Sequence, residues 1–290
     1  RLVDWLAEAR PDLTFPHTHG ETSDIRVAHC PERVLPGKVM QELISNDRVI
    51  GGMTRRCSDL ASLLYKTFVS GECVIASGPR VAEMAKLTEN SFRDVNIAFA
   101  NELSMICDKL GMDVWELIPL ANRHPRVNIL QPGPGVGGHC IAVDPWFIVS
   151  SAPDQARLIR TAREVNDSKP LWVIEKWRAA MGAHLVQNPT KTSAEVAVAI
   201  YGLSFKPDID DLRESPALQI AAKIAQEHSG PVTIIEPHID ALPAMLNIPN
   251  VTLEKACILA DIHILLVDHK LFKSHKKPAG LIIDTRGIWA

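Results

Sequence analysis

The sequence predicts an α/β protein with a doubly wound parallel sheet near its C-terminus and one long helix in its middle. Four apolar, strand-like segments alternate with helical segments after residue 191, which implies right-handed crossovers and a parallel sheet. A polar stretch at 187–193 separates this domain from the rest. From Pro79 to Leu110 the chain is rich in helix formers, and Gly111 follows as a plausible C-cap.

The remaining elements follow from local patterns. Before the long helix we expect a short strand at 25–32 and helical material at 56–68. After it we expect a helix at 114–124, and another at about 154–181 that is interrupted at Pro170. In the last domain we expect strands at 195–203, 232–237, 262–268 and 280–287, with helices at 215–228 and 254–261.

Composition narrows the functional classes. The chain has 290 residues, is 46% hydrophobic and 22% charged, and has a net charge of −3. These values are typical of a globular protein and give no argument for nucleic acid or an anionic membrane. No apolar run approaches the ~20 residues that cross a bilayer. Six cysteines without a C-x-x-C pair suit a reducing cytoplasm and indicate no metal site. The opening "RLVDWLAEAR" reads as the middle of a domain, so we expect a piece of a longer protein.

The stretch "QPGPGVGGHC" (131–140) matches G-x-G-x-x-G, the glycine pattern of dinucleotide-binding turns. Such a turn follows a buried strand and opens a helix, whereas this one is followed by "IAVDPW". The glycines can instead let the backbone pass close to a bound group and hold Cys140 at a rim. A thiol near positive charge is a potential nucleophile, and His139, His124 and Arg126 are near in sequence.

Two further groups of residues are candidates for chemistry. Lys86, Asn90 and Arg93 are spaced to lie on one face of the long helix, where they could stabilise a developing oxyanion or simply form its solvated side. Glu32, followed by Arg33, ends a predicted strand and could activate water, although glutamates are common there.

The last domain suggests an anion site. Its first turn, "YGLSFKPD", lacks the pyrophosphate glycines, although Glu236 ends the second strand where a ribose-binding acid is often found. Lys206, Arg213 and Arg286 lie at strand ends and could face one crevice that holds a nucleotide diphosphate. Taken singly, each could equally be a solvated surface cation.

Four motifs in order resemble the UDP-glucose/GDP-mannose dehydrogenase family. They are "CPE", "KLTEN", "GVGGHCIAVD" and "FKPDIDDLRES", and together they span nearly the whole chain. The resemblance implies an N-terminal Rossmann remnant at 1–77, a central helical and dimerisation region at 78–190, and a Rossmann-like UDP-binding domain at 191–290. Within the family, "CPERVLPGK" and "NRHPRVNI" are similar to the branch that oxidises N-acetylated sugars such as UDP-N-acetyl-D-mannosamine, for surface polysaccharides.

The resemblance implies a four-electron oxidation of a primary alcohol to a carboxylate with two NAD molecules. Cys140 would form a thiohemiacetal and then a thioester. Lys86 and Asn90 would stabilise charge on oxygen, Asp144 would support the cysteine and the water, and Glu32 would handle that water. Arg213 would reach the NAD. The substrate-binding positions would be Arg33, Val34, Arg93, His124, Arg126, Gly137, Phe205, Lys206 and Arg286.

Some points depart from the family or stay open. Pro36 stands where glucose-type members carry a second glutamate, which puts the role of Glu32 in doubt. The family's glycine fingerprint for NAD is missing from this sequence. His124 and Arg126 could serve a neighbouring subunit's site in a homodimer built on the long helix. UDP-N-acetylglucosamine or UDP-glucose as substrate, a one-step hydroxy-acid dehydrogenase, and an inactive nucleotide-sugar-binding module are the alternatives.

Overall fold

The structure is a computed structural model that describes residues 2–34 and 38–289. The chain forms two compact units, residues 1–90 and 91–290, and helix α5 (Pro79–Leu110) continues from the first into the second. Residues 91–190 of the predicted central region and the predicted UDP-binding domain therefore share the second unit, and the three-part division stays a prediction.

The first unit contains a three-stranded sheet in the order β1–β2–β3. β2 pairs in parallel with β3 and antiparallel with β1. Helix α4 packs on β2 and begins after Thr54, whose hydroxyl caps it by accepting the N–H of Cys57. The strand predicted at 25–32 is only two residues long, whereas the predicted helix at 56–68 is confirmed. The elements are α1 (Leu2–Ala9), α2 (Pro16–His19), a 3-10 turn (Gly20–Thr22), β1 (Ala28–His29), α3 (Val39–Ser45), β2 (Arg48–Gly52), α4 (Arg55–Tyr65) and β3 (Cys73–Ile75).

Helix α5 has the predicted bounds, but the prediction for the helix around Pro170 was wrong. Helix α8 (Arg157–Gln187) passes through Pro170 without interruption. Pro170 cannot donate to the preceding turn. Pro170 is buried, however, and its ring lies against Gly135. This packing stabilises a proline inside a helix despite its low helix propensity. The other helices of this region are α6 (Val114–Ala121) and α7 (Asp144–Ser151).

The second unit contains the predicted parallel sheet, in the order β5–β4–β6–β7. All three strand pairs are parallel, and Val198 of β4 is in register with Val232 of β5 and with Ile262 of β6. Helices connect the strands, as the alternating pattern predicted. The elements are a 3-10 turn (Ser193–Glu195), β4 (Val198–Tyr201), α9 (Pro216–Glu227), β5 (Val232–Ile235), α10 (Leu253–Leu259), β6 (Ile262–Leu265), α11 (Lys270–Lys273) and β7 (Leu281–Asp284).

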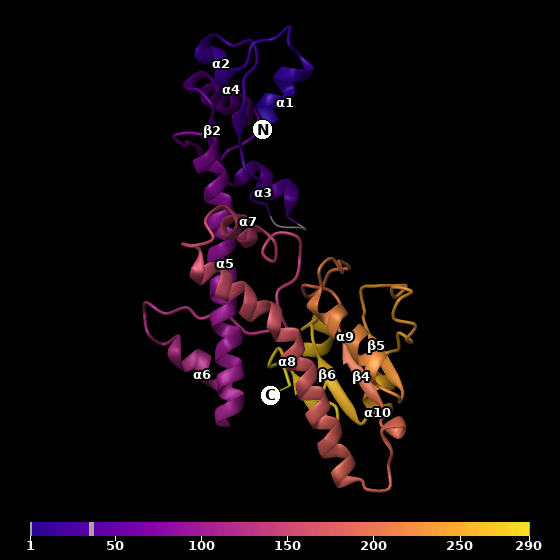
Figure 1. The fold of residues 1–290 in the computed structure, drawn as a ribbon. Coiled ribbons are helices and arrows are strands. Elements are labelled where there is room, and N and C mark those ends of the chain that lie inside the picture. The colour runs from indigo at the N-terminus through magenta and orange to yellow at the C-terminus, as the bar shows by residue number, and fades with distance from the viewer. Residues whose placement is uncertain (1, 35–37, 290) are drawn as a thin grey trace. The chain divides into compact units, whose positions relative to one another are not determined.

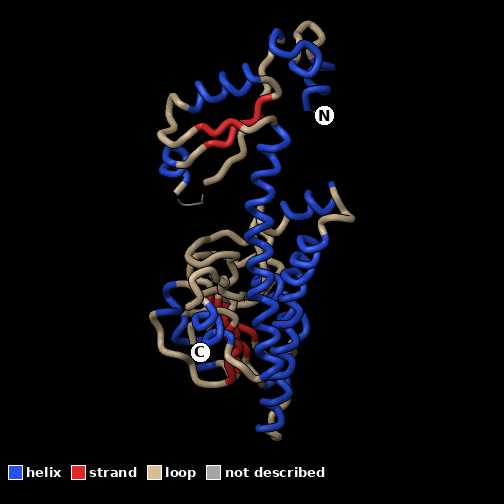
Figure 2. Tube along the Cα trace, turned by 90° about the vertical axis from the view of Figure 1, so that its left-hand side faces the viewer, coloured by secondary structure: helices blue, strands red, loops and turns tan. Residues whose placement is uncertain are grey.

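Both faces of this sheet are covered. Side chains alternate along each strand, so Ile200 faces α8 and α9 while Tyr201 faces α10 and α11. Figure 1 shows α8 and α9 beside this sheet, and Figure 2 shows the strands of each unit in red. The carboxyl ends of the strands carry the loops in which a doubly wound sheet binds its ligands.

Candidate active site

The glycine-rich segment 131–138 is an irregular loop. Among the described residues between Val127 and Gly137 there is no strand, and the next helix, α7, begins only at Asp144. The segment therefore lacks the strand–turn–helix geometry of a pyrophosphate turn, as the sequence indicated.

The end of this loop lies directly against the loop that follows β4. A Cβ atom at Gly137 would lie 2.6 Å from the Glu214 carbonyl oxygen and 2.8 Å from the Cβ of Phe205. Gly138 has φ of +82°, and its Cβ would lie 2.9 Å from the Phe205 ring. Its N–H also donates to the Arg213 carbonyl at 3.2 Å. Two of the predicted substrate positions, Gly137 and Phe205, are therefore in contact.

Cys140 is exposed immediately after this contact. Its carbonyl accepts the N–H groups of Val143 (3.1 Å) and Asp144 (2.8 Å), so the turn that presents the thiol also brings Asp144 to the start of α7. The pKa of Arg213 is raised mainly by its hydrogen bonds to Asp211, and Cys140 adds a smaller electrostatic contribution. The backbone of Arg213 thus holds the cysteine loop at Gly138, two residues before the predicted nucleophile.

Arg286 lies at the other end of the glycine loop. Its Nε donates to Asp268 at 2.8 Å, and its Nη1 donates to the Pro132 carbonyl at 3.3 Å. A Cβ at Gly133 would lie 2.6 Å from that Nη1. Asp284 accepts the backbone N–H of Arg286 at 2.7 Å and fixes the turn that carries it. This cation, and not only Cys140, is therefore positioned by the loop.

A buried polar network anchors the same loop to helices α5 and α8. Asn101 accepts the Gly133 N–H at 2.8 Å and donates to Asn166 at 2.9 Å. Asn166 donates to Asp94 at 2.8 Å, and Arg163 donates to Asp94 at 2.6 Å. Sequence reasoning missed these residues. The available signal was the spacing of Asp94 and Asn101 along one face of α5.

A cavity of about 280 Å³ lies behind the cysteine loop. Val136, Ala142 and Val143 line it from the loop, while Arg163 and Pro170 line it from α8. Arg163 and Asn166 of the buried network therefore line the same cavity as the cysteine loop.

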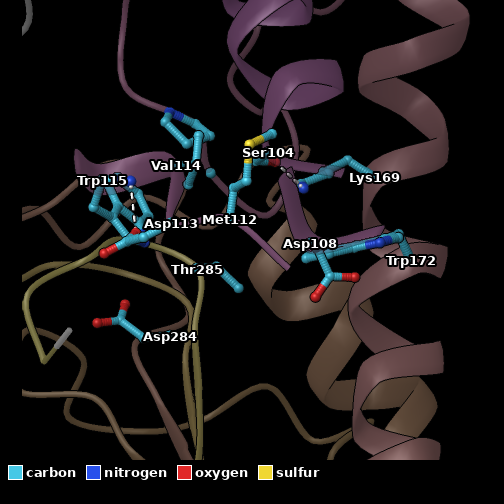
Figure 3. A pocket seen from close by; sticks show the side chains of 12 residues that line it. Ser104, Asp108, Met112, Asp113, Val114, Trp115, Lys169, Trp172, Asp284 and Thr285 are labelled. Carbon is cyan, nitrogen blue, oxygen red and sulfur yellow. Dashed lines mark hydrogen bonds between the residues drawn. The ribbon is translucent and has the colours of Figure 1, made fainter. Parts of the chain in front are cut away.

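A second cavity, of about 180 Å³, adjoins the start of the loop at Pro132. Figure 3 shows Ser104, Lys169 and Trp172 around it. Lys169 is buried, donates to the Ser104 hydroxyl at 2.6 Å and lies 3.6 Å from the Trp172 ring centroid. Burial lowers the pKa of Lys169 to about 7, against the opposing charge of Asp108.

In the first unit, Glu32 and Arg33 are each held by an ion pair. The Glu32 carboxylate accepts a hydrogen bond from Arg48 at 2.9 Å, and the Arg48 side chain is only 2% exposed. Arg33 pairs with Glu89 of α5 at 2.8 Å. These contacts connect the segment after β1 to β2 and to α5.

The other predicted residues are placed as follows. Asn90 is buried and Lys86 half-buried on the part of α5 within the first unit, and Arg93 is exposed on the part within the second. Their meeting with Cys140 stays a prediction. His124, Arg126 and Lys206 are exposed, and Val34 is half-buried. Pro36 lies outside the described residues.

Glu236 has a structural task at the end of β5. One carboxylate oxygen accepts the N–H groups of Leu203 (2.7 Å) and Ser204 (3.3 Å), and the other accepts that of His238 (3.0 Å). Because Glu236 is buried, it closes the turn after β4 from inside. Because both oxygens are engaged within the fold, the contacts favour the strand-end structural role over a ribose-binding acid.

Within the part of the chain that the structure describes, no helix is sufficiently long and apolar to span a bilayer.

Comparisons with known proteins agree with this geometry. Three domain models of the UDP-glucose/GDP-mannose dehydrogenase family match: the NAD binding domain at 3–69, the central domain at 80–168 and the UDP binding domain at 199–290. The chain is 61% identical over its whole length to UDP-N-acetyl-D-mannosamine dehydrogenase of Yersinia pestis and covers 70% of that protein. It is 58% identical to an NDP-N-acetyl-D-galactosaminuronic acid dehydrogenase of Ralstonia nicotianae, covering all of the chain and 67% of that protein.

Solved structures give the same result. The UDP-D-ManNAc dehydrogenase of Pyrococcus horikoshii superposes with a TM-score of 0.82 at 35% identity, covering 100% of this chain and 67% of that one. The UDP-N-acetyl-mannosamine dehydrogenase of S. aureus has a TM-score of 0.79 at 41% identity, covering 97% and 65%. These similarities confirm the predicted fold class.

Proposed function

The chain belongs to the UDP-glucose/GDP-mannose dehydrogenase family, and from this we propose that it oxidises UDP-N-acetyl-D-mannosamine at C6 to the uronate, a precursor for surface polysaccharide. The observation that carries the proposal is the exposed Cys140 on a loop that lies against Phe205 and beside Arg213. A thiol in this position can act as a nucleophile toward a sugar bound in front of the loop.

The chain's own residues account for the covalent part of the reaction. The Cys140 thiolate adds to the C6 aldehyde, so that a C–S bond forms and the carbonyl oxygen takes up the charge. Lys86 and Asn90 stabilise that oxygen. After the second oxidation the carbon is a thioester. Water then adds to it, the C–S bond breaks, the thiolate leaves, and a carboxylate remains.

NAD, when bound, supplies the hydride acceptor for both oxidations. Arg213, whose carbonyl accepts the Gly138 N–H, would contact NAD, and residues 3–69 match the family's NAD binding domain. Glu32 handles the attacking water, and its pairing with the buried Arg48 holds the carboxylate in one place.

The diphosphate of the substrate is held by Lys206 and Arg286. Arg286 is positioned by Asp268 and by the carbonyl of Pro132, and Lys206 is exposed in the turn after β4. The sugar contacts Arg33, Val34, Arg93 and Gly137.

A homodimer through α5 is part of the proposal. Phe92, Phe99 and Ile106 are spaced seven residues apart on α5, and their exposed fractions are 69%, 53% and 46%. An apolar stripe of this kind is expected to be covered by a second helix. In such a dimer, His124 and Arg126 would reach the neighbouring subunit's site.

The test is a comparison of wild type with Cys140→Ser, and with Cys73→Ser as the control. Titration calorimetry measures binding of UDP-N-acetyl-D-mannosamine, and NADH production with mass spectrometry of the product measures turnover. We expect Cys140→Ser to bind the sugar nucleotide but form no uronate, while Cys73→Ser resembles wild type.

Equal turnover by Cys140→Ser would favour a one-step hydroxy-acid dehydrogenase. Binding without turnover in wild type would make the chain a binding module, and no binding would contradict both proposals. The N-acetyl-D-galactosamine sugar nucleotide should be assayed in parallel, because the relative from Ralstonia nicotianae is nearly as similar.

A further inference from the structure

One peptide group of the glycine loop is held from both of its ends. The Pro132 carbonyl and the Gly133 N–H belong to the same planar peptide unit. The carbonyl accepts Arg286 Nη1 at 3.3 Å, and the N–H donates to Asn101 Oδ1 at 2.8 Å. Because a peptide unit rotates as one plane, turning its N–H away from Asn101 also turns its carbonyl away from Arg286. Asn101 on α5 and Arg286 after β7 are therefore connected through one rigid group.

Contacts deeper in the second unit fix which way the Asn101 amide points. Asn166 Nδ2 donates to the Asp94 carboxylate at 2.8 Å and to the Asp94 carbonyl at 3.1 Å. With both acceptors on this side, the amide oxygen of Asn166 faces Asn101, whose Nδ2 donates to it at 2.9 Å. The oxygen of the Asn101 amide is then the end that faces the Gly133 N–H.

The three side chains of this relay, Asp94, Asn166 and Asn101, are at most 1% exposed. They cannot exchange their partners for water. A buried amide that turns away from its partner is left unsatisfied, which is costly, so each member of the relay is held in one orientation. The Gly133 N–H therefore has a fixed acceptor at the point where the loop meets Arg286.

We propose that Asn101 is a positioning residue, which holds Arg286 in the orientation that receives the diphosphate of a nucleotide sugar. The inference rests on the function proposed above, in which Arg286 binds this diphosphate. The Arg286 side chain contacts the protein at two nitrogens, from Nε to Asp268 at 2.8 Å and from Nη1 to the Pro132 carbonyl. Two contacts fix the plane of a guanidinium, whereas one alone lets it rotate. Asn101 acts on the second contact.

The first test follows Arg286 itself and needs no ligand. In protein labelled with ¹⁵N-arginine, the Arg286 side-chain signals are identified by their loss in Arg286→Met. We expect Asn101→Ala to shift these signals and to speed rotation of the guanidinium. Asn96→Ala is the matched control, because the Asn96 amide donates to the Phe92 carbonyl of the same helix, and it should leave the signals in place. Unchanged Arg286 signals in Asn101→Ala would overturn the proposal.

The second test is a double-mutant cycle on the affinity for UDP, measured by titration calorimetry. Asn101→Ala should weaken UDP binding about five- to tenfold in the unaltered chain but less than about twofold in the Arg286→Met background. Asn101→Leu, which keeps the volume and leaves less room for water, should behave like Asn101→Ala and is the second variant if that one is unstable. A residue with only a structural role would weaken binding equally in both backgrounds, and this result would contradict the proposal.

The cycle also separates this inference from the proposed function. UDP binding involves no oxidation, so a chain that binds UDP, shows the coupling and forms no uronate would contradict the proposed function alone. A chain that forms uronate but shows no coupling would contradict the role of Asn101 alone. Absence of UDP binding by the unaltered chain would contradict both.

Discussion

Breaking the buried ion pair between Asp94 and Arg163 should strongly destabilise the second unit. The two side chains are 0% and 1% exposed, and Arg163 donates to Asp94 at 2.6 Å. Arg163→Met keeps most of the volume but leaves a buried carboxylate with only the neutral Asn166 side chain as a donor to its Oδ1. Breaking a buried pair in this way costs about 3–5 kcal/mol. In a unit of this size that cost lowers Tm by roughly 6–20 °C.

The assay is thermal and urea unfolding followed by circular dichroism. Arg178→Met is the matched control, because Arg178 is on the same helix and pairs with Glu227 but is 52% exposed. Its loss should cost about 0–1 kcal/mol. Adding Asp94→Asn to Arg163→Met should recover much of the loss, since a neutral amide needs no cation. A cost near that of the control, or no recovery in the double variant, would refute the reasoning.

Three further predictions concern the loop and its surroundings. Because the folded-state pKa of Lys169 lies below its ordinary value of 10.5, the native state binds fewer protons than the unfolded chain between about pH 7 and pH 10. The free energy of unfolding should therefore rise across this window by a few kcal/mol in urea titrations, and Lys169→Met should flatten the rise. Gly137→Ala should displace the cysteine loop and abolish turnover. Its control is Gly182→Ala, in open space on α8, which should raise stability by about 0.5–1 kcal/mol. An active Gly137→Ala enzyme would contradict the packing argument. Asp268→Asn should release Arg286 and raise KM for the sugar nucleotide more than it lowers kcat, and unchanged kinetics would show that the contact does not matter.

Local sequence patterns predicted those elements whose ends carry residues that start or stop them, such as proline and glycine. Helix α5 has its predicted bounds because Pro79 starts it and Gly111 follows it. The strands of the C-terminal sheet were recognisable because both of its faces are buried, so each strand reads as an apolar run. Pro170 was misjudged because its tolerance depends on a partner, Gly135, that only the folded chain brings near.

The predictable part of the candidate site was its single reactive residue, Cys140. Cys140 stood out as the single cysteine in a polar, glycine-rich setting, and it is the exposed one. The residues that hold the loop were not predictable, since Arg163 and Asp94 are 69 positions apart and neither belongs to a recognisable motif. The contacts that Glu236 makes were not predictable either, because its backbone partners belong to the turn after β4, about 33 positions earlier in the chain.

The hydrogen bonds of Glu236 also bear on how substrate affinity depends on ionic strength. The Glu236 carboxylate occupies the backbone N–H groups of Leu203 and Ser204 after β4. Because this carboxylate belongs to the same chain, its effective concentration exceeds that of any free phosphate, so these N–H groups do not bind the phosphate of a ligand. In the proposed function, the diphosphate of a nucleotide sugar is bound by side-chain cations such as the exposed Lys206. Added salt screens the attraction between solvent-exposed charges. It weakens buried hydrogen bonds from backbone N–H groups to a phosphate much less. Affinity for the substrate should therefore fall as the ionic strength of the solution rises.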